Sequence, residues 1–196
     1  EMCIRDRSKA RINSQEVKKN DIFFAIKGKK IDANNFVAEA FKKKASLAIV
    51  NRIQSSLNKK KQIKIKSSLK LLTDASKIFR KNINTKIIGI TGSCGKTTLK
   101  ELVGNSLKKI SKVSISPKSY NNKFGVPLSL FNINQNDEFG ILEVGMDKKG
   151  EIDFLTKKIM PNIGVITNIS YAHIKNFKNL LGVAQAKSEI INNKSK

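Results

Sequence analysis

The chain has 196 residues, 39% of them hydrophobic, and a net charge of +24, so it can form one ordinary domain or two small ones with packed cores. No apolar stretch reaches the roughly 20 residues of a membrane span, and two distant cysteines favour a reducing cytoplasm over a disulfide-rich secreted fold. The basic charge comes mostly from Lys without interleaved aromatic residues, which argues against a nucleic-acid groove. We expect a monomer that binds no nucleic acid.

The first part of the chain predicts a small α/β domain at 11–83, preceded by residues 1–10, which we interpret as a non-native leader. Apolar runs predict strands, and apolar residues at helical spacing predict helices. The strands are expected at 22–26, 47–50 and, more weakly, 62–65, and the helices at 34–44 and 67–82. We expect the aromatic core of this domain to contain Phe23, Phe24, Phe36 and Phe41.

The remainder, 84–196, alternates strands and helices, which predicts a parallel sheet covered by helices in an incomplete P-loop-type domain of the α/β class. Strands are expected at 86–90, 112–115, 139–143 and 163–167, and helices at 96–110, 125–131, 150–159 and 179–191. In such sheets, ligands bind outside the carboxyl ends of the strands. We therefore look for functional residues at those ends.

A glycine-rich turn follows the first of these strands and predicts a phosphate-binding loop. It comprises Gly92, Ser93, Cys94, Gly95, Lys96, Thr97 and Thr98. Glycines let several N–H groups converge on one anion, and the following helix adds its positive end. Lys96 would contact the terminal phosphates and Thr97 a Mg²⁺ ion, so Mg-ATP or Mg-GTP is the expected ligand. Cys94 is interpreted as a tolerated small residue rather than a nucleophile.

Two further strand ends carry polar residues. Glu143 and the 168–173 segment, which includes Asn168 and His173, are expected at the same edge of the sheet as the loop. From the residues alone, Glu143 is as easily a surface carboxylate, and a single histidine is more often structural than a ligand.

Lys187 lies on an apolar helical face with Leu180, Val183 and Ala184. Burial there would lower its pKa and leave a neutral amine that can react with CO₂. The alternative is a lysine whose charged end reaches out of the core to solvent.

Several motifs in order carry a resemblance to a known family. They are TGSCGKTT at 91–98, YNNKFGVPLSL at 120–130, EVGM at 143–146, GEI at 150–152, TNISYAH at 167–173 and AKSEI at 186–190. Together they resemble the Mur ligases of bacterial cell-wall synthesis. Residues 13–36 are similar to the uridine-nucleotide-binding domain of that family.

The resemblance implies an ATP-dependent ligase that forms an amide through an acyl phosphate. Its motifs look most like those of the branch that joins UDP-N-acetylmuramoyl-tripeptide to D-alanyl-D-alanine. The implied roles are phosphate binding by Lys96 and Mg²⁺ binding by Thr97, and a second Mg²⁺ held by Glu143, His173 and a carbamylated Lys187. Asn121 and Asn122 would contact substrate, and Asn168 would shape the nucleotide site.

Two departures from the family pattern affect these expectations. Asn13-Ser14-Gln15 replaces the usual Asp-Ser/Thr-Arg, which leaves the Ser14 hydroxyl for the uridine-nucleotide substrate. The chain also stops soon after Lys187, without the rest of the ATP-binding domain or a C-terminal domain for the amine substrate. We therefore predict that this polypeptide alone does not complete ligation.

Three alternatives remain open at this point. The chain could belong to another Mur-type ligase or a folylpolyglutamate synthase, or it could be a non-catalytic nucleotide-binding fragment. A P-loop GTPase or a nucleic-acid-dependent ATPase is the third, although the sequence lacks the Asn-Lys-x-Asp motif that reads guanine.

Overall fold

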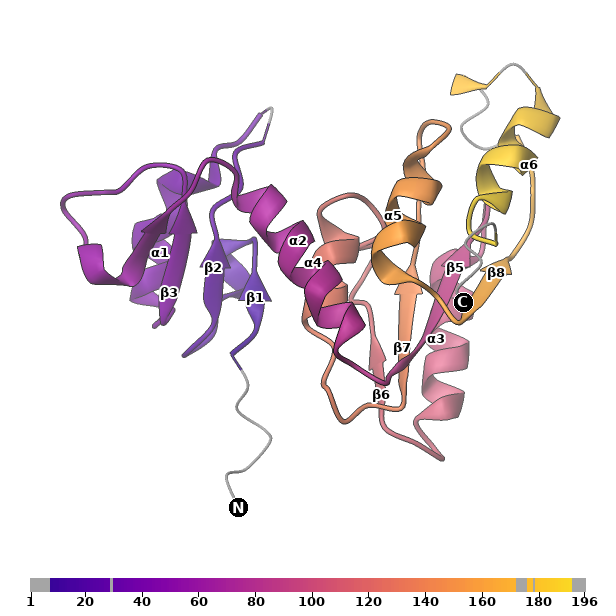
Figure 1. Ribbon diagram of the computed structural model, residues 1–196, viewed down its shortest axis with the longest axis horizontal. Helices are drawn as coiled ribbons and strands as arrows, with labels where there is room; N and C mark the ends of the chain where they lie inside the picture. Colours follow the sequence, from indigo (N-terminus) through magenta and orange to yellow (C-terminus); the bar gives the residue numbers. More distant parts are fainter. Residues whose placement is uncertain (1–7, 29, 172–175, 178, 192–196) are drawn as a thin grey trace. The chain divides into compact units, whose positions relative to one another are not determined.

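The computed structural model describes residues 8–28, 30–171, 176–177 and 179–191. It confirms the α/β class, because the chain forms two compact units, Glu1–Asp74 and Ala75–Lys196, and each contains a parallel sheet (Figure 1). The division falls inside a helix, whereas the sequence places the domain boundary after residue 83, and that boundary stays a prediction. Within the described residues, no helix is long and apolar enough to span a bilayer.

The first unit is a four-stranded parallel sheet with the strand order β1-β2-β3-β4. Its elements in chain order are β1 (Ala10–Arg11), η2 (Ser14–Glu16), β2 (Ile22–Phe24), η3 (Ala33–Phe36), α1 (Val37–Lys42), β3 (Leu47–Val50), η4 (Lys59–Lys61), β4 (Gln62–Lys64) and the start of α2 (Ser68–Lys81). The three predicted strands are confirmed. Strand β1 was not predicted, and Ala10 in it pairs with Ile22 although it falls in the expected leader.

The core of the first unit lies between the sheet and α1 and is built around Phe23, which is fully buried. Small residues such as Ala40 and Ala48 let the helix approach the strands closely. The expectation for Phe36 was wrong, because 41% of that residue is exposed. The reason is that 33–36 forms a separate 3-10 turn, so its side chains do not continue the buried face of α1.

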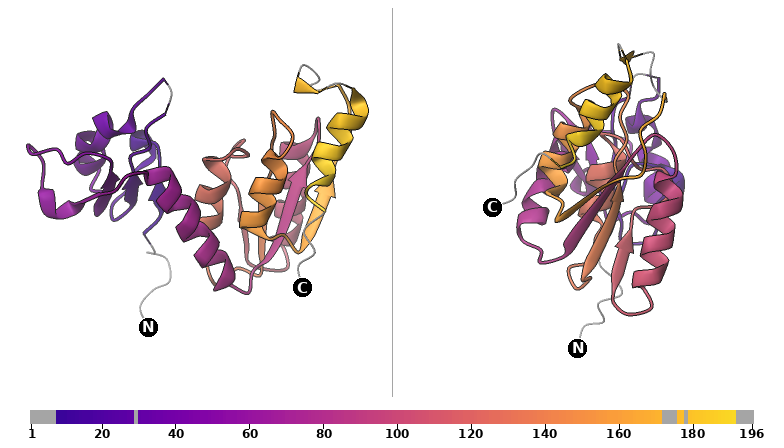
Figure 2. Two further views of the ribbon diagram at one scale, coloured as in Figure 1. Left: turned by 45° about the horizontal axis from the view of Figure 1, so that its top comes forward. Right: turned by 90° about the vertical axis from the view of Figure 1, so that its right-hand side faces the viewer.

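The second unit is a parallel sheet with the order β6-β7-β5-β8. Its elements are β5 (Lys86–Thr91), α3 (Lys96–Leu107), β6 (Val113–Ile115), α4 (Gly125–Phe131), β7 (Phe139–Glu143), α5 (Glu151–Ile159), β8 (Ile163–Ile166) and α6 (Leu180–Ser188). All four predicted strands and all four predicted helices are confirmed, although α3 and α6 end three residues earlier than expected. Figure 2 shows α3 on one side of the sheet and α5 and α6 on the other.

Alternating side chains of the strands form two cores, because successive residues of a strand point to opposite faces. Ile88, Ile90 and Ile141 face α3, whereas Ile87 and Leu142 pack with residues of α4, α5 and α6. Both faces of the sheet are therefore covered, as a parallel sheet requires.

The strand register brings the expected functional segments to one edge of this sheet. Ile90 lies opposite Glu143 on β7, and Thr91 lies opposite Ile166 on β8. The glycine-rich loop after Thr91, the end of β7 and the segment after Ile166 thus meet at the carboxyl ends of neighbouring strands.

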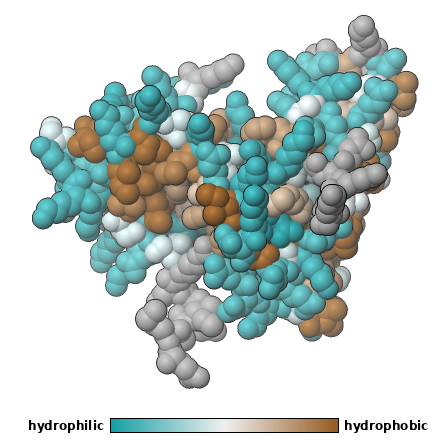
Figure 3. All heavy atoms as spheres, viewed as in Figure 1, coloured by the Kyte–Doolittle hydropathy of each residue, from teal (hydrophilic) through white to brown (hydrophobic). Residues whose placement is uncertain are grey.

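Hydrophilic residues cover much of the molecular face seen in Figure 3, consistent with the large number of lysines in the chain.

Candidate nucleotide-binding site

The glycine-rich loop turns sharply between β5 and α3 with the help of two glycines. Gly92 has φ 150° and Gly95 has φ 76°, and a Cβ at Gly92 would lie 1.8 Å from the Thr167 hydroxyl oxygen. Helix α3 begins at Lys96 and has no side-chain cap, so the N–H groups of its first turn have no partner within the helix. Such a helix start binds anions such as phosphate.

The segment after β8 holds the loop in place. Asn168 accepts hydrogen bonds at its Oδ1 from the backbone N–H groups of Ser93 (3.1 Å) and Cys94 (2.9 Å). The Thr167 hydroxyl donates to the Cys94 carbonyl over 2.6 Å. The structure thus places Asn168 against the loop, as a residue that shapes the nucleotide site would be, whereas the Cys94 thiol is exposed.

The side chains of Lys96 and Thr97 point to different partners. Lys96 donates from Nζ to the carbonyl of Gly92 (2.8 Å) and to that of Ser93 (3.3 Å), so its charge lies over the loop. Thr97 donates from Oγ1 to Oε2 of Glu143 over 2.7 Å. Thr98 lies exposed in the same first turn of α3.

Glu143 is a buried carboxylate, only 1% exposed, and not the surface residue that its sequence position also allowed. Its Oε1 accepts a hydrogen bond from the Asn121 side-chain amide over 2.8 Å. A hydroxyl and a carboxylate beside a phosphate loop are oxygen ligands of the kind that Mg²⁺ uses. Among the described residues, no group of three or more His, Cys, Asp or Glu side chains is arranged to hold a metal ion.

Lys187 is buried on α6, as its helical spacing predicted, with an exposed fraction of 1%. Burial, helped by the nearby charge of Lys96, lowers the pKa of Lys187 to about 8. About a tenth of the amine is therefore neutral at pH 7, far more than for a lysine with an ordinary pKa. This favours a reactive lysine over one that reaches out to solvent.

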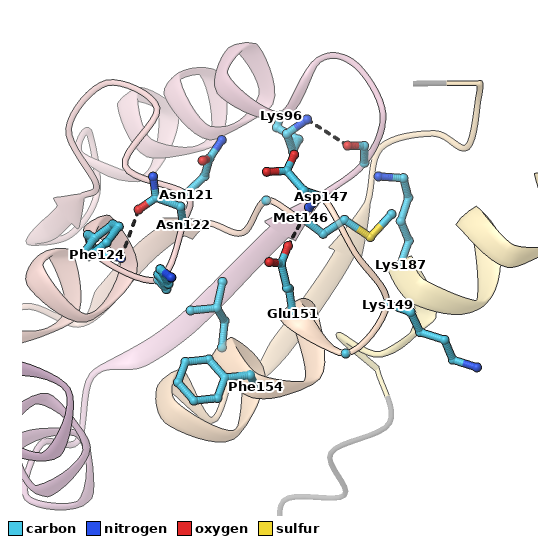
Figure 4. Close-up of a pocket in the computed structure, with 15 residues that line it drawn as sticks. Lys96, Asn121, Asn122, Phe124, Met146, Asp147, Lys149, Glu151, Phe154 and Lys187 are labelled. Carbon is cyan, nitrogen blue, oxygen red and sulfur yellow. Dashed lines mark hydrogen bonds between the residues drawn. The ribbon is translucent and has the colours of Figure 1, made fainter. Parts of the chain in front are cut away.

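Gly92, Lys96, Asn121 and Lys187 of this group line a pocket of about 700 Å³ in the second unit (Figure 4). Its lining residues are Gly92, Lys96, Asn121, Asn122, Lys123, Phe124, Gly145, Met146, Asp147, Lys149, Gly150, Glu151, Phe154, Leu155 and Lys187. Figure 4 shows Lys187 extending from α6 towards the side of the pocket that Lys96 occupies. The pocket therefore brings together a phosphate loop, three further lysines and an apolar wall.

The two asparagines before α4 line this pocket and also fix its geometry. Asn122 accepts at Oδ1 from the N–H groups of Phe124 and Gly125, both at 3.0 Å, and so holds the start of α4. Asn121 accepts at its carbonyl from the Gly145 N–H over 2.7 Å. Their contact with substrate stays a prediction.

Of the expected site residues, Gly92, Lys96, Asn121, Asn122 and Lys187 line this pocket, whereas Thr97, Glu143, Asn168 and the rest of the loop lie outside its lining. Two further expected site residues are Ser14 and His173. Ser14 lies in the first unit, where it is 6% exposed and donates from Oγ to the Glu39 carboxylate over 2.8 Å. His173 lies outside the described residues. Their roles stay predictions.

Sequence reasoning missed carboxylates that organise the pocket wall. Glu189, the C-cap residue of α6, accepts hydrogen bonds from the N–H groups of Gly150 (2.9 Å) and Asp153 (3.0 Å) at the start of α5. Glu151 accepts from the Asp147 N–H over 2.6 Å. The motifs GEI and AKSEI contain both residues, but spacing along the sequence does not show that one helix caps the other.

Lys100 was also missed, although it is fully buried behind the loop. A second lysine four residues after Lys96 places both on one side of α3, and this was the available signal.

Comparison with known families gives a match to the family described as Mur ligase middle domain, over residues 90–196. The chain belongs to the Mur ligase family. The match spans the loop, Glu143, the 168–173 segment and Lys187.

Individual Mur ligases agree with this assignment. The chain is 35% identical over 175 residues to the UDP-N-acetylmuramoyl-tripeptide–D-alanyl-D-alanine ligase of Haemophilus influenzae, an alignment that covers 87% of this chain and 38% of that protein. A crystal structure of MurF from Acinetobacter baumannii superposes with a TM-score of 0.83 at 31% identity, covering 96% of this chain and 41% of the other. The MurF ligase of Thermotoga maritima in complex with ADP gives 0.77 at 33% identity, covering 94% and 43%. The chain spans about two fifths of the length of these relatives.

Proposed function

We propose that the chain acts in ATP-dependent amide-bond formation in cell-wall precursor synthesis, joining UDP-N-acetylmuramoyl-tripeptide to D-alanyl-D-alanine. The observation that carries this proposal is that Lys96 of the phosphate loop and buried Lys187 line one pocket. Buried Glu143 lies next to this pocket, hydrogen-bonded to Thr97 of the loop and to the pocket residue Asn121. The two substrates are those in the name of the Haemophilus influenzae relative. The reaction would take place in the cytoplasm, and it requires neither a membrane nor a nucleic acid.

In this reaction a substrate carboxylate attacks the γ-phosphorus of ATP, and the bond from that phosphorus to the bridging oxygen of ADP breaks. The incoming amine then attacks the acyl phosphate, and inorganic phosphate leaves. The N–H groups at the start of α3 and the Lys96 charge hold the phosphates and offset the negative charge that develops. The protein thus contributes mainly positioning and charge stabilisation.

Thr97 and Glu143 are the residues that would hold Mg²⁺ beside the loop. The Thr97 hydroxyl and Oε2 of Glu143 lie 2.7 Å apart, close enough to bind the same ion. When bound, the ion would neutralise phosphate oxygens and orient them. Lys187, with its pKa lowered to about 8, could be carbamylated, which would convert the amine into a further oxygen ligand.

The proposal is tested by titrating the 196-residue chain with ATP, ADP and GTP in the presence of Mg²⁺ by calorimetry. We expect one site that binds adenine nucleotides and that is lost in Lys96→Met. Absence of nucleotide binding would overturn the proposal, and a clear preference for GTP would favour the GTPase alternative.

The substrates are tested separately, with radiolabelled D-alanyl-D-alanine, UDP-N-acetylmuramoyl-tripeptide and ATP. The 196 residues alone are predicted to bind nucleotide without forming product. Product formed by this chain would contradict that prediction and support the ligase assignment directly.

A further inference from the structure

Lys100 is the most deeply buried charge next to the site, and no role has yet been assigned to it. Its side chain has no exposed surface, although it belongs to a residue type that is almost never fully buried without partners. It lies on α3 one turn after Lys96, which places it behind the phosphate loop.

The Lys100 ammonium group has one carbonyl and two carboxylate partners. Nζ donates to the Lys118 carbonyl, and it forms ion pairs with the Glu101 carboxylate at 3.3 Å and with Oε2 of Glu143 at 3.9 Å. These partners offset the cost of burying the charge. The group therefore links α3, the end of β7 and the segment before α4.

The contact with Lys118 stabilises an unusual backbone conformation. Lys118 has φ 47°, in the left-handed region that residues with a side chain seldom adopt. The chain then continues to Asn121 and Asn122, which line the pocket. The hydrogen bond from Lys100 to the Lys118 carbonyl thus fixes the backbone just before these two asparagines.

Lys100 is also linked to Asn121 through Glu143. Glu143 receives hydrogen bonds from Thr97 at one oxygen and from Asn121 at the other. A cation next to a buried carboxylate offsets the cost of its burial, and removal of that cation makes the burial costly. Lys100 therefore supports both Glu143 and the residue that contacts it.

We propose that Lys100 is a positioning residue that holds the Glu143 carboxylate and the Asn121–Asn122 segment in register with the phosphate loop, so that a divalent cation and a nucleoside polyphosphate bind together. This inference rests on the proposed nucleotide-binding function. Lys100 does not touch substrate and acts through Glu143 and Asn121.

The test compares Lys100→Gln with Lys108→Gln, an exposed lysine at the end of the same helix. Gln removes the charge but retains an N–H donor for the Lys118 carbonyl. We therefore choose Lys100→Gln over Lys100→Met, which has no such donor and is more prone to misfold. For each full 196-residue chain, the Kd of ADP is measured with Mg²⁺ and with EDTA, and thermal unfolding is recorded alongside.

In Lys100→Gln the gain in ADP affinity that Mg²⁺ provides should fall about tenfold or more, as is typical for residues that orient metal ligands. The affinity in EDTA should change little. In the ligand-free protein, the NMR signals of the Asn121 side-chain amide should shift in Lys100→Gln and not in Lys108→Gln.

A purely structural role would lower the ADP affinity with Mg²⁺ and in EDTA by the same factor, and this result would overturn the inference whatever the unfolding temperature. The inference would also be overturned if the gain in ADP affinity from Mg²⁺ stayed the same or became larger in Lys100→Gln. A larger gain is what charge repulsion alone predicts, because removal of the lysine charge would favour binding of the Mg²⁺ ion. If the unmodified chain binds no ADP, the proposed function fails as well. Normal binding with an unaltered Mg²⁺ effect refutes only the role of Lys100.

Discussion

The two sheets of the molecule share one architecture and use their carboxyl ends differently. In the first unit, polar residues after the strands bond to one another, and Asn34 is paired with both Asp32 and Asn51. In the second unit, the corresponding ends carry the phosphate loop and Glu143, next to a pocket of about 700 Å³. A parallel sheet thus supplies the place for a site, and the loops decide whether polar groups there serve the fold or a ligand.

The largest expected effect concerns the core of the first unit. Phe23→Ala should lower the free energy of unfolding by about 3–5 kcal/mol, because Phe23 is fully buried and its removal leaves a cavity. Urea unfolding measures this, with Phe36→Ala as the control, since that side chain is partly exposed. Where the variant is still folded, its ADP affinity should equal that of the unmodified chain. A loss of affinity would show that the site depends on the first unit's core.

Lys96→Met should weaken ADP binding by about 100-fold, because it removes the charge at the phosphate loop. Its effect on unfolding should be small, since Lys96 is not part of either core. Calorimetry checks the first effect and urea unfolding the second, and Lys108→Met serves as the charge-matched control. Equal nucleotide affinities in the two variants would contradict the assigned role of the loop.

Two asparagine variants sharpen the comparison between the strand ends. Asn34→Ala should lower the free energy of unfolding by about 1–3 kcal/mol, because it leaves buried polar groups unpaired, and should leave ADP binding unchanged. Asn121→Ala should instead reduce the Mg²⁺ dependence of ADP binding, because Glu143 loses a donor. Urea unfolding and calorimetric ADP titration, each with both variants, measure these effects. The reverse pattern would show that the first unit holds the functional polar cluster.

A further expected effect is a pH dependence of stability from Lys187. Because its folded pKa is lowered to about 8, the unfolded chain binds more protons between that pH and the ordinary lysine pKa of about 10.4. The stability of the unmodified chain should therefore rise over this range relative to Lys187→Met, and the cost of burying the charge should be fully present below pH 8. Urea unfolding at pH 7, 8, 9 and 10 measures the difference. Parallel curves would mean that Lys187 keeps an ordinary pKa.

The strands and helices of the second unit could be predicted because their signals are local. The run at β5 is rich in β-branched residues, and α4 has the predicted limits, 125–131. Strand β1 was not predictable in the same way, because two residues carry no periodicity and form a strand only by pairing with β2. The start of η3 depends on the Asp32 side chain, which accepts a hydrogen bond from the Asn34 N–H.

The candidate site could be predicted as far as its motifs reach. Lys96, Glu143 and Lys187 lie at the expected strand and helix positions, and the burial of Lys187 followed from its helical face. The support of Glu143 by Lys100 and the capping of α5 by Glu189 could not be predicted, because both join residues that only the packing brings together.

The hydrogen bonds from the loop to Asn168 order part of the loop before any nucleotide binds. Because the Ser93 and Cys94 amides are already bonded to Asn168, the conformational entropy of this part of the loop is lost when the chain folds and not when the nucleotide arrives. These two amides should exchange slowly with solvent deuterium even in the ligand-free protein. The loop would then meet its ligand as a rigid template.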